Sequence, residues 1–354
     1  MNIRPELLDV GAYKFEAHDA AVKLDQNESP WPADSRMQAA LAEAVSSFEP
    51  NRYPDLLPFH LRAELARLHG WDEEGVTVAG GSNILIQSLV VAAGVGRTVL
   101  TVSPTFSVYA LQARLLAGRL VEVPLTDGFN LDVPALKAAM AEARGVLFIA
   151  SPAAPTGNVH PRAQLEELAD AAGERWLVVI DEAYQQFSGV DNSELAKRPN
   201  VVVLRTFSKA AGLAGLRLGY ALSSPGLGTQ LQKTVLPFSV SRLQEQLALA
   251  VLGMPELMEQ HVAATVLERD RVFRALQDLS GVTPHESDAN FILFRVADAG
   301  AVHSALLERG VLVRRQDHLP GLEGCLRVSV GLGQENTQFL DALAAIMASQ
   351  QPRG

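Results

Sequence analysis

The chain has 354 residues, which is enough for roughly two domains of ~150 residues each, and 48% of its residues are hydrophobic and 20% charged. This composition excludes an intrinsically disordered chain, which would have few apolar residues and a high charge. The net charge of −10 and the lack of a Lys/Arg run argue against nucleic acid as a partner.

The cysteine content and the length of the apolar runs exclude further classes. Cys325 is the single cysteine, so the chain has no internal disulfide and no zinc site built from cysteine pairs. We expect a cytoplasmic protein without a metal site. Apolar runs fall far short of the ~20 residues of a membrane span, and the N-terminal residues lack the apolar segment of a signal peptide. A membrane is therefore not an expected partner.

The first predicted elements are buried strands. Residues 1–29 are irregular and are expected to form an arm. From residue 76 onward, short Val/Ile/Leu runs predict strands, which are near-continuously apolar as in a sheet buried on both faces. Helical stretches between several of them, such as 161–172, favour a mostly parallel, helix-flanked sheet. The predicted strands are 76–80, 98–104, 120–125, 145–151, 177–184, 201–209 and 216–223.

The pattern changes after about residue 240. A long helix is predicted over 255–279, with one apolar stripe that includes Met258, Val262, Val266 and Phe273. The elements that follow predict a smaller α+β domain: strands at 289–296, 311–315 and 325–331, and helices at 299–309 and 336–349. We therefore expect an arm at 1–29 that packs with the small domain, a large domain at 30–245 and a small C-terminal domain at 246–354.

The sequence TFSK at 206–209 places a lysine where a buried strand ends. A desolvated lysine near other cations has a lowered pKa and can form a Schiff base. Thr206, Ser208 and Arg217 together could hold a phosphate through two hydroxyls and a planar guanidinium. A surface lysine and an ordinary salt bridge of Arg217 are the alternatives.

Other strand ends also carry polar or aromatic groups. Asp181, in DEAY at 181–184, is costly to bury without a positive partner, and a protonated pyridine nitrogen would be one. Tyr184 could donate to a phenolate oxygen of the same ring. The sequence GGSN at 80–83 precedes an apolar helical run and could bind an anion at a helix N-terminus. Phe106 offers a stacking ring. A helix cap, a tight turn and a core phenylalanine are the corresponding alternatives.

A proline-rich loop, SPAAPTGN at 151–158, completes this set. Ligands of open α/β sheets bind beyond the carboxyl ends of the strands. Because all these motifs follow strands of one predicted sheet, we expect them to converge there.

The order of the motifs is typical of one family. Along the chain come KLDQNESP, NRYPD, GGSN, PTF, PTG, DEAY, TFSK with Arg217, and CLRVSVG. The whole chain thereby resembles the pyridoxal-phosphate-dependent aminotransferases of the aspartate aminotransferase fold, fold type I, and is most similar to the histidinol-phosphate aminotransferases.

This resemblance implies roles for the site residues. Lys209 would bind pyridoxal phosphate covalently and move the proton between Cα and C4′. Asp181 would pair with the pyridine nitrogen, Tyr184 would bond to the 3′ oxygen and Phe106 would stack on the ring. Tyr53 would reach the cofactor phosphate of a neighbouring subunit, which implies a homodimer; a turn residue before Pro54 is the alternative. The remaining cofactor contacts, mostly to the phosphate, would come from Gly81, Ser82, Asn83, Thr206, Ser208 and Arg217.

One position departs from the family pattern. The family carries an asparagine immediately before Pro-Thr-Gly, which donates to the 3′ oxygen, and here that residue is Ala154. Asn158 lies nearby in sequence but beyond the glycine.

The resemblance also implies a substrate. Arg327 matches the arginine that grips a substrate carboxylate in most of the superfamily, and the histidinol-phosphate enzymes use arginines at the positions of both Arg327 and Arg314 to hold the substrate phosphate. A solvated strand end is the alternative for Arg314. Tyr13 and Asn27 are further candidates for the substrate pocket.

The expected activity is transamination of histidinol phosphate with 2-oxoglutarate in histidine biosynthesis. An aromatic or broad-specificity aminotransferase and a threonine-phosphate decarboxylase would share the same cofactor site. A ligand-sensing domain of a transcription regulator is disfavoured, since no basic helix accompanies the large domain.

Overall fold

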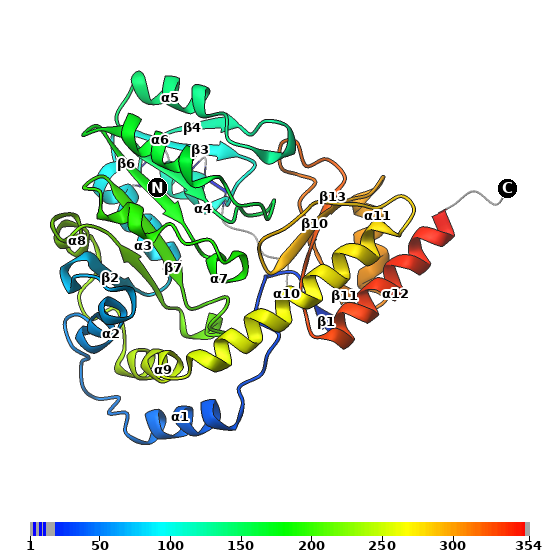
Figure 1. Ribbon diagram of the computed structural model, residues 1–354, viewed down its shortest axis with the longest axis horizontal. Coiled ribbons are helices and arrows are strands. Elements are labelled where there is room, and N and C mark those ends of the chain that lie inside the picture. Colours follow the sequence, from blue (N-terminus) through cyan, green and yellow to red (C-terminus); the bar gives the residue numbers. More distant parts are fainter. Residues whose placement is uncertain (1–2, 5–6, 9, 12–17, 351–354) are drawn as a thin grey trace.

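The computed structural model describes residues 3–4, 7–8, 10–11 and 18–350. Two sheets organise this part of the chain (Figure 1). A seven-stranded sheet is built from residues between 76 and 222, and a four-stranded sheet from residues between 283 and 329.

The large sheet has a parallel centre. β4 (Arg119–Pro124), β3 (Thr98–Ser103), β5 (Gly145–Ala150), β6 (Trp176–Asp181) and β7 (Val201–Thr206) run parallel in that spatial order. β8 (Gly219–Leu222) is antiparallel to β7 and to the edge strand β2 (Val76–Ala79). The predicted α/β class with a mostly parallel sheet is confirmed. Because β5, β6 and β7 are parallel neighbours, their carboxyl ends lie side by side.

Helices cover both faces of this sheet, which explains why central strands such as β5 and β6 are fully buried, whereas the edge strand β4 keeps exposed polar residues. One face packs against α3 (Ser82–Ala93), α4 (Val108–Leu115) and α8 (Pro225–Leu231). Buried residues of the other face include those from α1 (Ser35–Ser46), α2 (Phe59–His69), α5 (Val133–Ala141), α6 (Arg162–Ala172) and α9 (Arg242–Leu252). α6 matches the predicted helix closely, except that Pro161 precedes it in an extended conformation (ψ 131°).

The small sheet is antiparallel, in the order β12 (Arg314–Arg315), β13 (Cys325–Ser329), β10 (Phe291–Arg295) and β9 (Thr283–Pro284). α11 (Ala299–Glu308) and α12 (Gly333–Gln350) pack on it. The single strand predicted over 311–315 is wrong. β11 (Val311–Leu312) pairs instead with β1 (Val22–Lys23), and only β12 joins the sheet. This split brings the N-terminal segment beside the small sheet.

The long helix α10 (Pro255–Gln277) runs from one sheet toward the other (Figure 1). Its first half packs Met258, Val262 and Val266 against a cluster that contains Tyr184 and the short helix α7 (Gln185–Ser188). Its second half buries Val272 and Leu276 in the core of the small sheet. The apolar stripe predicted for this helix therefore packs against two separate clusters, one around Tyr184 and one in the small sheet. The division of the chain into domains at residue 245 stays a prediction.

Candidate active site

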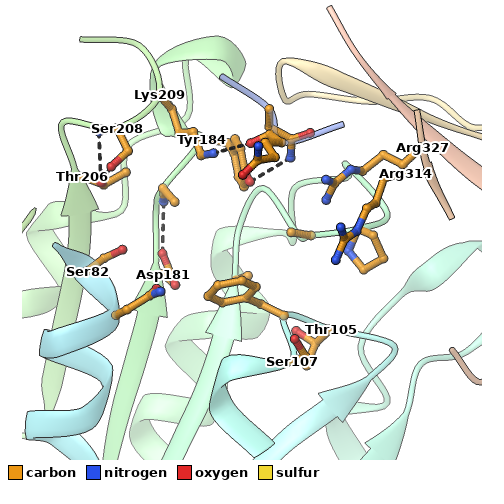
Figure 2. A pocket seen from close by; sticks show the side chains of 18 of the residues that line it. Ser82, Thr105, Ser107, Asp181, Tyr184, Thr206, Ser208, Lys209, Arg314 and Arg327 are labelled. Atoms are coloured by element: carbon orange, nitrogen blue, oxygen red, sulfur yellow. Dashed lines mark hydrogen bonds between the residues drawn. The ribbon is translucent and has the colours of Figure 1, made fainter. Parts of the chain in front are cut away.

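A cavity of about 580 Å³ opens where β5, β6 and β7 end. Figure 2 shows side chains from both sheets directed into it, with Lys209, Tyr184 and Asp181 from the large sheet and the two arginines from the small one. The predicted site residues that line it are Asn27, Ser82, Asn83, Phe106, Asp181, Tyr184, Thr206, Ser208, Lys209, Arg217, Arg314 and Arg327.

Lys209 follows β7 and its amine lies inside the cavity. Nζ donates to the Gln26 carbonyl at 2.9 Å and lies 5.7 Å from the centre of the Tyr184 ring. Burial, followed by the positive charge of Arg327, brings the pKa of Lys209 down to about 7; Glu28 opposes this shift, and Arg217 adds a smaller lowering effect. A large fraction of this amine is therefore neutral and nucleophilic near neutral pH.

Asp181 is the last residue of β6, and burial raises its pKa. Two hydrogen bonds act in the opposite direction: Oδ1 accepts from the Ala183 amide at 3.2 Å, and Oδ2 accepts from the Tyr109 hydroxyl at 2.8 Å. Sequence reasoning missed Tyr109. The signal available was its position three residues after Phe106, at the start of α4 and next to a residue already proposed to contact the ring.

Tyr184 and Asn27 form a hydrogen-bonded pair. The Asn27 amide donates to the Tyr184 hydroxyl at 2.9 Å, which leaves the tyrosine proton available to a ligand. Asn27 Oδ1 accepts from the Ser329 hydroxyl at 3.0 Å. Asn27, proposed from sequence as a substrate contact, thus lies beside the tyrosine rather than on the arginines.

The opposite end of the cavity suits a phosphate. The Thr206 and Ser208 hydroxyls are 3.0 Å apart, and Nη1 of Arg217 lies 3.4 Å from the Ser208 hydroxyl. Helix α3 begins at Ser82, and the backbone N–H groups of its first turn have no acceptor within the helix, so they can bind an anion. Gly81 has a φ of 100°, and a Cβ there would lie 3.0 Å from Nη2 of Arg217. The positive φ favours glycine at this position, and a larger side chain would crowd the guanidinium.

The two arginines of the small sheet face each other. Arg314 of β12 and Arg327 of β13 are register partners on adjacent antiparallel strands, so their side chains leave the sheet on the same face. Arg327 also lies over the Phe291 ring, with Cζ 5.2 Å from its centre. Like charges directly opposite each other are destabilising, and an anion bound between them would offset that repulsion.

Residues 25–27, called the strap below, touch groups from both sheets. The Asp25 carbonyl accepts from Nη2 of Arg327 at 2.8 Å, the Gln26 carbonyl accepts from Lys209, and the Asn27 side chain donates to Tyr184. β1, which is separated from the strap by one residue, pairs with β11. Three consecutive residues thus join the arginine side of the cavity to the lysine side.

Gly81, Tyr53 and Asn158, all named from the sequence, are not among the residues that line this cavity. Tyr53 is 82% exposed, does not line the cavity, and packs its ring 5.4 Å from that of Phe238. Tyr13 lies outside the described residues. Asn158 donates to the Phe129 carbonyl at 3.1 Å, whereas Ala154 itself lines the cavity. Asn158 is therefore not in place to substitute for the family asparagine.

The donor set fits pyridoxal phosphate. A lysine of lowered pKa, a buried carboxylate, a tyrosine hydroxyl and a phosphate-sized group of N–H, hydroxyl and guanidinium donors surround one cavity. These are the groups that this cofactor needs at its aldehyde, ring nitrogen, 3′ oxygen and phosphate.

Comparison with known proteins identifies the family of the chain. The family model of aminotransferase class I and II matches residues 8–343. A histidinol-phosphate aminotransferase of Deinococcus radiodurans is 43% identical, covering 97% of this chain and 96% of that protein, and one of Chlorobium chlorochromatii is 39% identical with the same coverage.

A solved structure gives the same result. The crystal structure of histidinol-phosphate aminotransferase from Sinorhizobium meliloti in complex with pyridoxal-5′-phosphate superimposes with a TM-score of 0.88 at 26% identity, covering 99% of this chain and 98% of that one. The chain therefore belongs to the class I and II aminotransferases and is a pyridoxal-phosphate-dependent enzyme that transfers amino groups.

Proposed function

We propose that this aminotransferase exchanges an amino group between histidinol phosphate and 2-oxoglutarate, giving imidazole-acetol phosphate and glutamate in histidine biosynthesis. The observation that carries the proposal is the cross-strand pair Arg314 and Arg327, both of which line the cavity. Relatives that match nearly the whole chain bear the corresponding name.

The two guanidinium groups supply the charge and the donors that a phosphate monoester needs. Such a group carries close to two negative charges at neutral pH and accepts several hydrogen bonds. A phosphate therefore attracts two guanidinium groups more strongly than a carboxylate with its single charge does. The arginines come from the small sheet and Lys209 from the large one, so the substrate would be held by its phosphate with its amine toward Lys209.

The cofactor roles remain those that the family resemblance implies. Pyridoxal phosphate, when bound, supplies a ring that accepts electrons from bonds at the substrate Cα. Asp181 would hold the ring nitrogen, Tyr184 would donate to the 3′ oxygen, and Phe106 would pack on the ring face. Gly81, Ser82, Thr206, Ser208 and Arg217 would bind the phosphate, and Asn83 would be a further contact of the cofactor. Lys209 would hold the cofactor, and its released amine would then carry the proton at Cα.

We also infer a homodimer. Loops 51–56 and 236–238 lie together, since the Phe238 amide donates to the Leu56 carbonyl at 3.2 Å. They expose an apolar patch made of Tyr53, Leu56, Leu236 and Phe238. Contiguous exposed apolar surface is typical of protein interfaces, and a second copy placed here would bring Tyr53 toward its neighbour's phosphate site.

A cytoplasmic location is part of the proposal. Cys325 is buried and has no disulfide partner, as suits a reducing compartment. In the part of the chain that the structure describes, no helix combines the length and apolarity needed to cross a membrane.

A half-reaction screen tests the substrate. The enzyme loaded with pyridoxal phosphate is mixed separately with histidinol phosphate, glutamate, phenylalanine and threonine phosphate, and the change in cofactor absorbance is followed. The proposal requires histidinol phosphate to react fastest among the amines other than glutamate. A faster reaction of phenylalanine would assign an aromatic aminotransferase, and release of CO₂ from threonine phosphate would assign a decarboxylase.

A further inference from the structure

The Asp181 carboxylate lies in a buried environment that disfavours its charge. Asp181 is 4% exposed, and burial is the largest influence on its pKa, which it raises. Among the described residues, no lysine, arginine or histidine forms an ion pair with it. A carboxylate that must be an anion for a pyridine nitrogen therefore depends on hydrogen-bond donors to remain ionised.

Tyr109 supplies the side-chain donor. Its hydroxyl lies 2.8 Å from Oδ2 of Asp181, whereas the other bond, from the Ala183 amide to Oδ1, is longer at 3.2 Å. Burial and the neighbouring Asp181 charge raise the pKa of Tyr109 well above its ordinary value, so the phenol keeps its proton. A phenol has one proton to donate, and here it points to the carboxylate.

The Tyr109 ring is held so that this donor is fixed in space. The residue is fully buried on α4, and its ring stacks on Phe148 of β5, with centres 4.9 Å apart and planes at 11°. On another side the Phe106 ring meets it edge to face at 5.7 Å and 86°. Because these packed neighbours restrain the ring, the hydroxyl constrains the orientation of the Asp181 carboxylate rather than following it.

We propose that Tyr109 is a positioning residue that keeps the Asp181 carboxylate anionic and oriented for the ring nitrogen of the cofactor. This inference rests on the proposed role of Asp181 and adds a residue to it. Phe106 lies just before α4 and Tyr109 lies in its first turn, so one short segment would supply both the ring-stacking side chain and the anchor of the carboxylate.

The test compares two ligands on the full-length, cofactor-free chain: pyridoxal phosphate and its analogue with a carbon in place of the ring nitrogen. Tyr109→Phe removes one oxygen and retains the ring. Loss of a hydrogen bond to a charged group weakens binding roughly 10–150-fold. We expect a loss of that size for pyridoxal phosphate and an unchanged affinity for the analogue, which cannot pair with Asp181.

A pH profile gives a second readout. Without its donor, Asp181 has a higher pKa and takes up a proton earlier as the pH falls. The affinity of Tyr109→Phe for pyridoxal phosphate should therefore decline at a higher pH than that of the natural protein. Tyr109→Leu, measured in parallel, removes the same donor in a smaller side chain and should show the same selective loss.

Two controls separate the possible failures. Tyr220→Phe alters another buried tyrosine, whose hydroxyl lies 2.9 Å from Nε2 of His69, and should leave the ratio of the two affinities unchanged. Asp181→Asn should weaken pyridoxal phosphate selectively, and if it does not, the proposed role of Asp181 fails and the inference with it. If Asp181→Asn discriminates between the ligands but the Tyr109 variants weaken both equally or neither, the inference about Tyr109 alone is overturned.

Discussion

The reactivity of Lys209 results from its surroundings. The residue follows the buried strand β7 and shares its cavity with Arg327 and Arg217. Burial and these positive charges together bring its pKa to about 7. A folded-state pKa below the ordinary value means that the amine loses its proton at a lower pH than an exposed lysine would. The same charges that attract an anionic ligand thus also activate the nucleophile.

Attachment of pyridoxal phosphate to the cofactor-free protein should therefore increase as the pH rises through about 7. Arg327→Met should move this midpoint upward, because it removes a positive charge that favours the neutral amine. Borohydride trapping at a series of pH values, followed by peptide mapping, measures it. Lys209→Ala should show no attachment and no turnover, and label on another lysine would contradict the assignment.

Arg327 has a matched control on the neighbouring strand. Arg327→Ala should weaken histidinol phosphate roughly 10–150-fold, the cost of a lost hydrogen bond to a charged group, which is a much larger effect than its effect on cofactor affinity. Arg315→Ala removes an exposed arginine that lies outside the cavity and pairs with Asp317 at 2.7 Å, and it should have little effect. Steady-state kinetics of both variants decide the point. Unchanged histidinol phosphate kinetics with lost phenylalanine activity would instead favour the aromatic enzyme.

Ala154 should leave a spectroscopic mark. An asparagine donor stabilises the anionic 3′ oxygen and makes it less basic, so the proton shared with the attached lysine nitrogen is held less tightly. A hydrogen bond to a charged group contributes roughly 1.5–3 kcal/mol, and a pKa unit corresponds to about 1.4 kcal/mol. Ala154→Asn should therefore lower the pKa of that nitrogen by about one unit or somewhat more.

The measurement is a spectrophotometric pH titration of the loaded enzyme. Asn158→Ala is the control and should leave the curve unchanged, because Asn158 donates to the Phe129 carbonyl instead. Superimposable curves for Ala154→Asn and the natural protein would show that another donor already satisfies the oxygen.

At the scale of elements, β6 and β7 are joined behind the cavity by a buried ion cluster. Arg205, the residue before Thr206, donates to Glu182 at 2.8 Å and to Asp191 at 2.7 Å, and Glu182 directly follows Asp181. The arginine is 4% exposed and Glu182 is fully buried. The ends of the two strands that carry Asp181 and Thr206 are therefore fixed relative to each other by charges that face away from the ligand.

Removal of the cation from this cluster should be costly. Arg205→Met leaves a buried carboxylate without its partner, which destabilises by about 3–5 kcal/mol. The exposed pair of Lys137 and Glu167 has a similar separation of 2.7 Å, and Lys137→Met should cost at most about 1 kcal/mol. Urea denaturation of both variants compares the free energies of unfolding. Equal losses would mean that the buried pair has no special structural role.

The elements also show what the sequence could and could not predict. Near-continuous apolar runs located the strands of the large sheet to within a few residues. A strand buried on both faces has few polar residues along it, so its apolar run marks its position directly. The prediction of one strand over 311–315 was wrong because nothing in this short run marks a break. The break arises from pairing, since β11 pairs with β1 and β12 pairs with β13. Tyr109 was missed since its partner, Asp181, lies 72 residues away.

At the scale of the whole molecule, the apolar patch around Tyr53 predicts the assembly. Leu236 is 76% exposed within it, whereas Leu267 is 72% exposed on α10 outside it. Leu236→Glu should dissociate the proposed homodimer and weaken pyridoxal phosphate, because a charge in an apolar interface is expensive to desolvate. Leu267→Glu should change neither property. Sedimentation velocity gives the assembly, and an unchanged dimer in the Leu236 variant would place the interface elsewhere.

The strap has a consequence for how ligands influence each other. Arg327, Lys209 and Tyr184 are hydrogen-bonded to three consecutive residues, so a shift of this short segment alters all three bonds together. Coupling free energy between two ligands is reciprocal. An anion that draws Arg327 away from the Asp25 carbonyl would thus change the affinity for the cofactor by the same factor as the cofactor changes the affinity for that anion. Phosphate titrations with and without the cofactor would measure this factor. A substitution in the strap should change the effect of phosphate on cofactor affinity and the effect of the cofactor on phosphate affinity by the same factor.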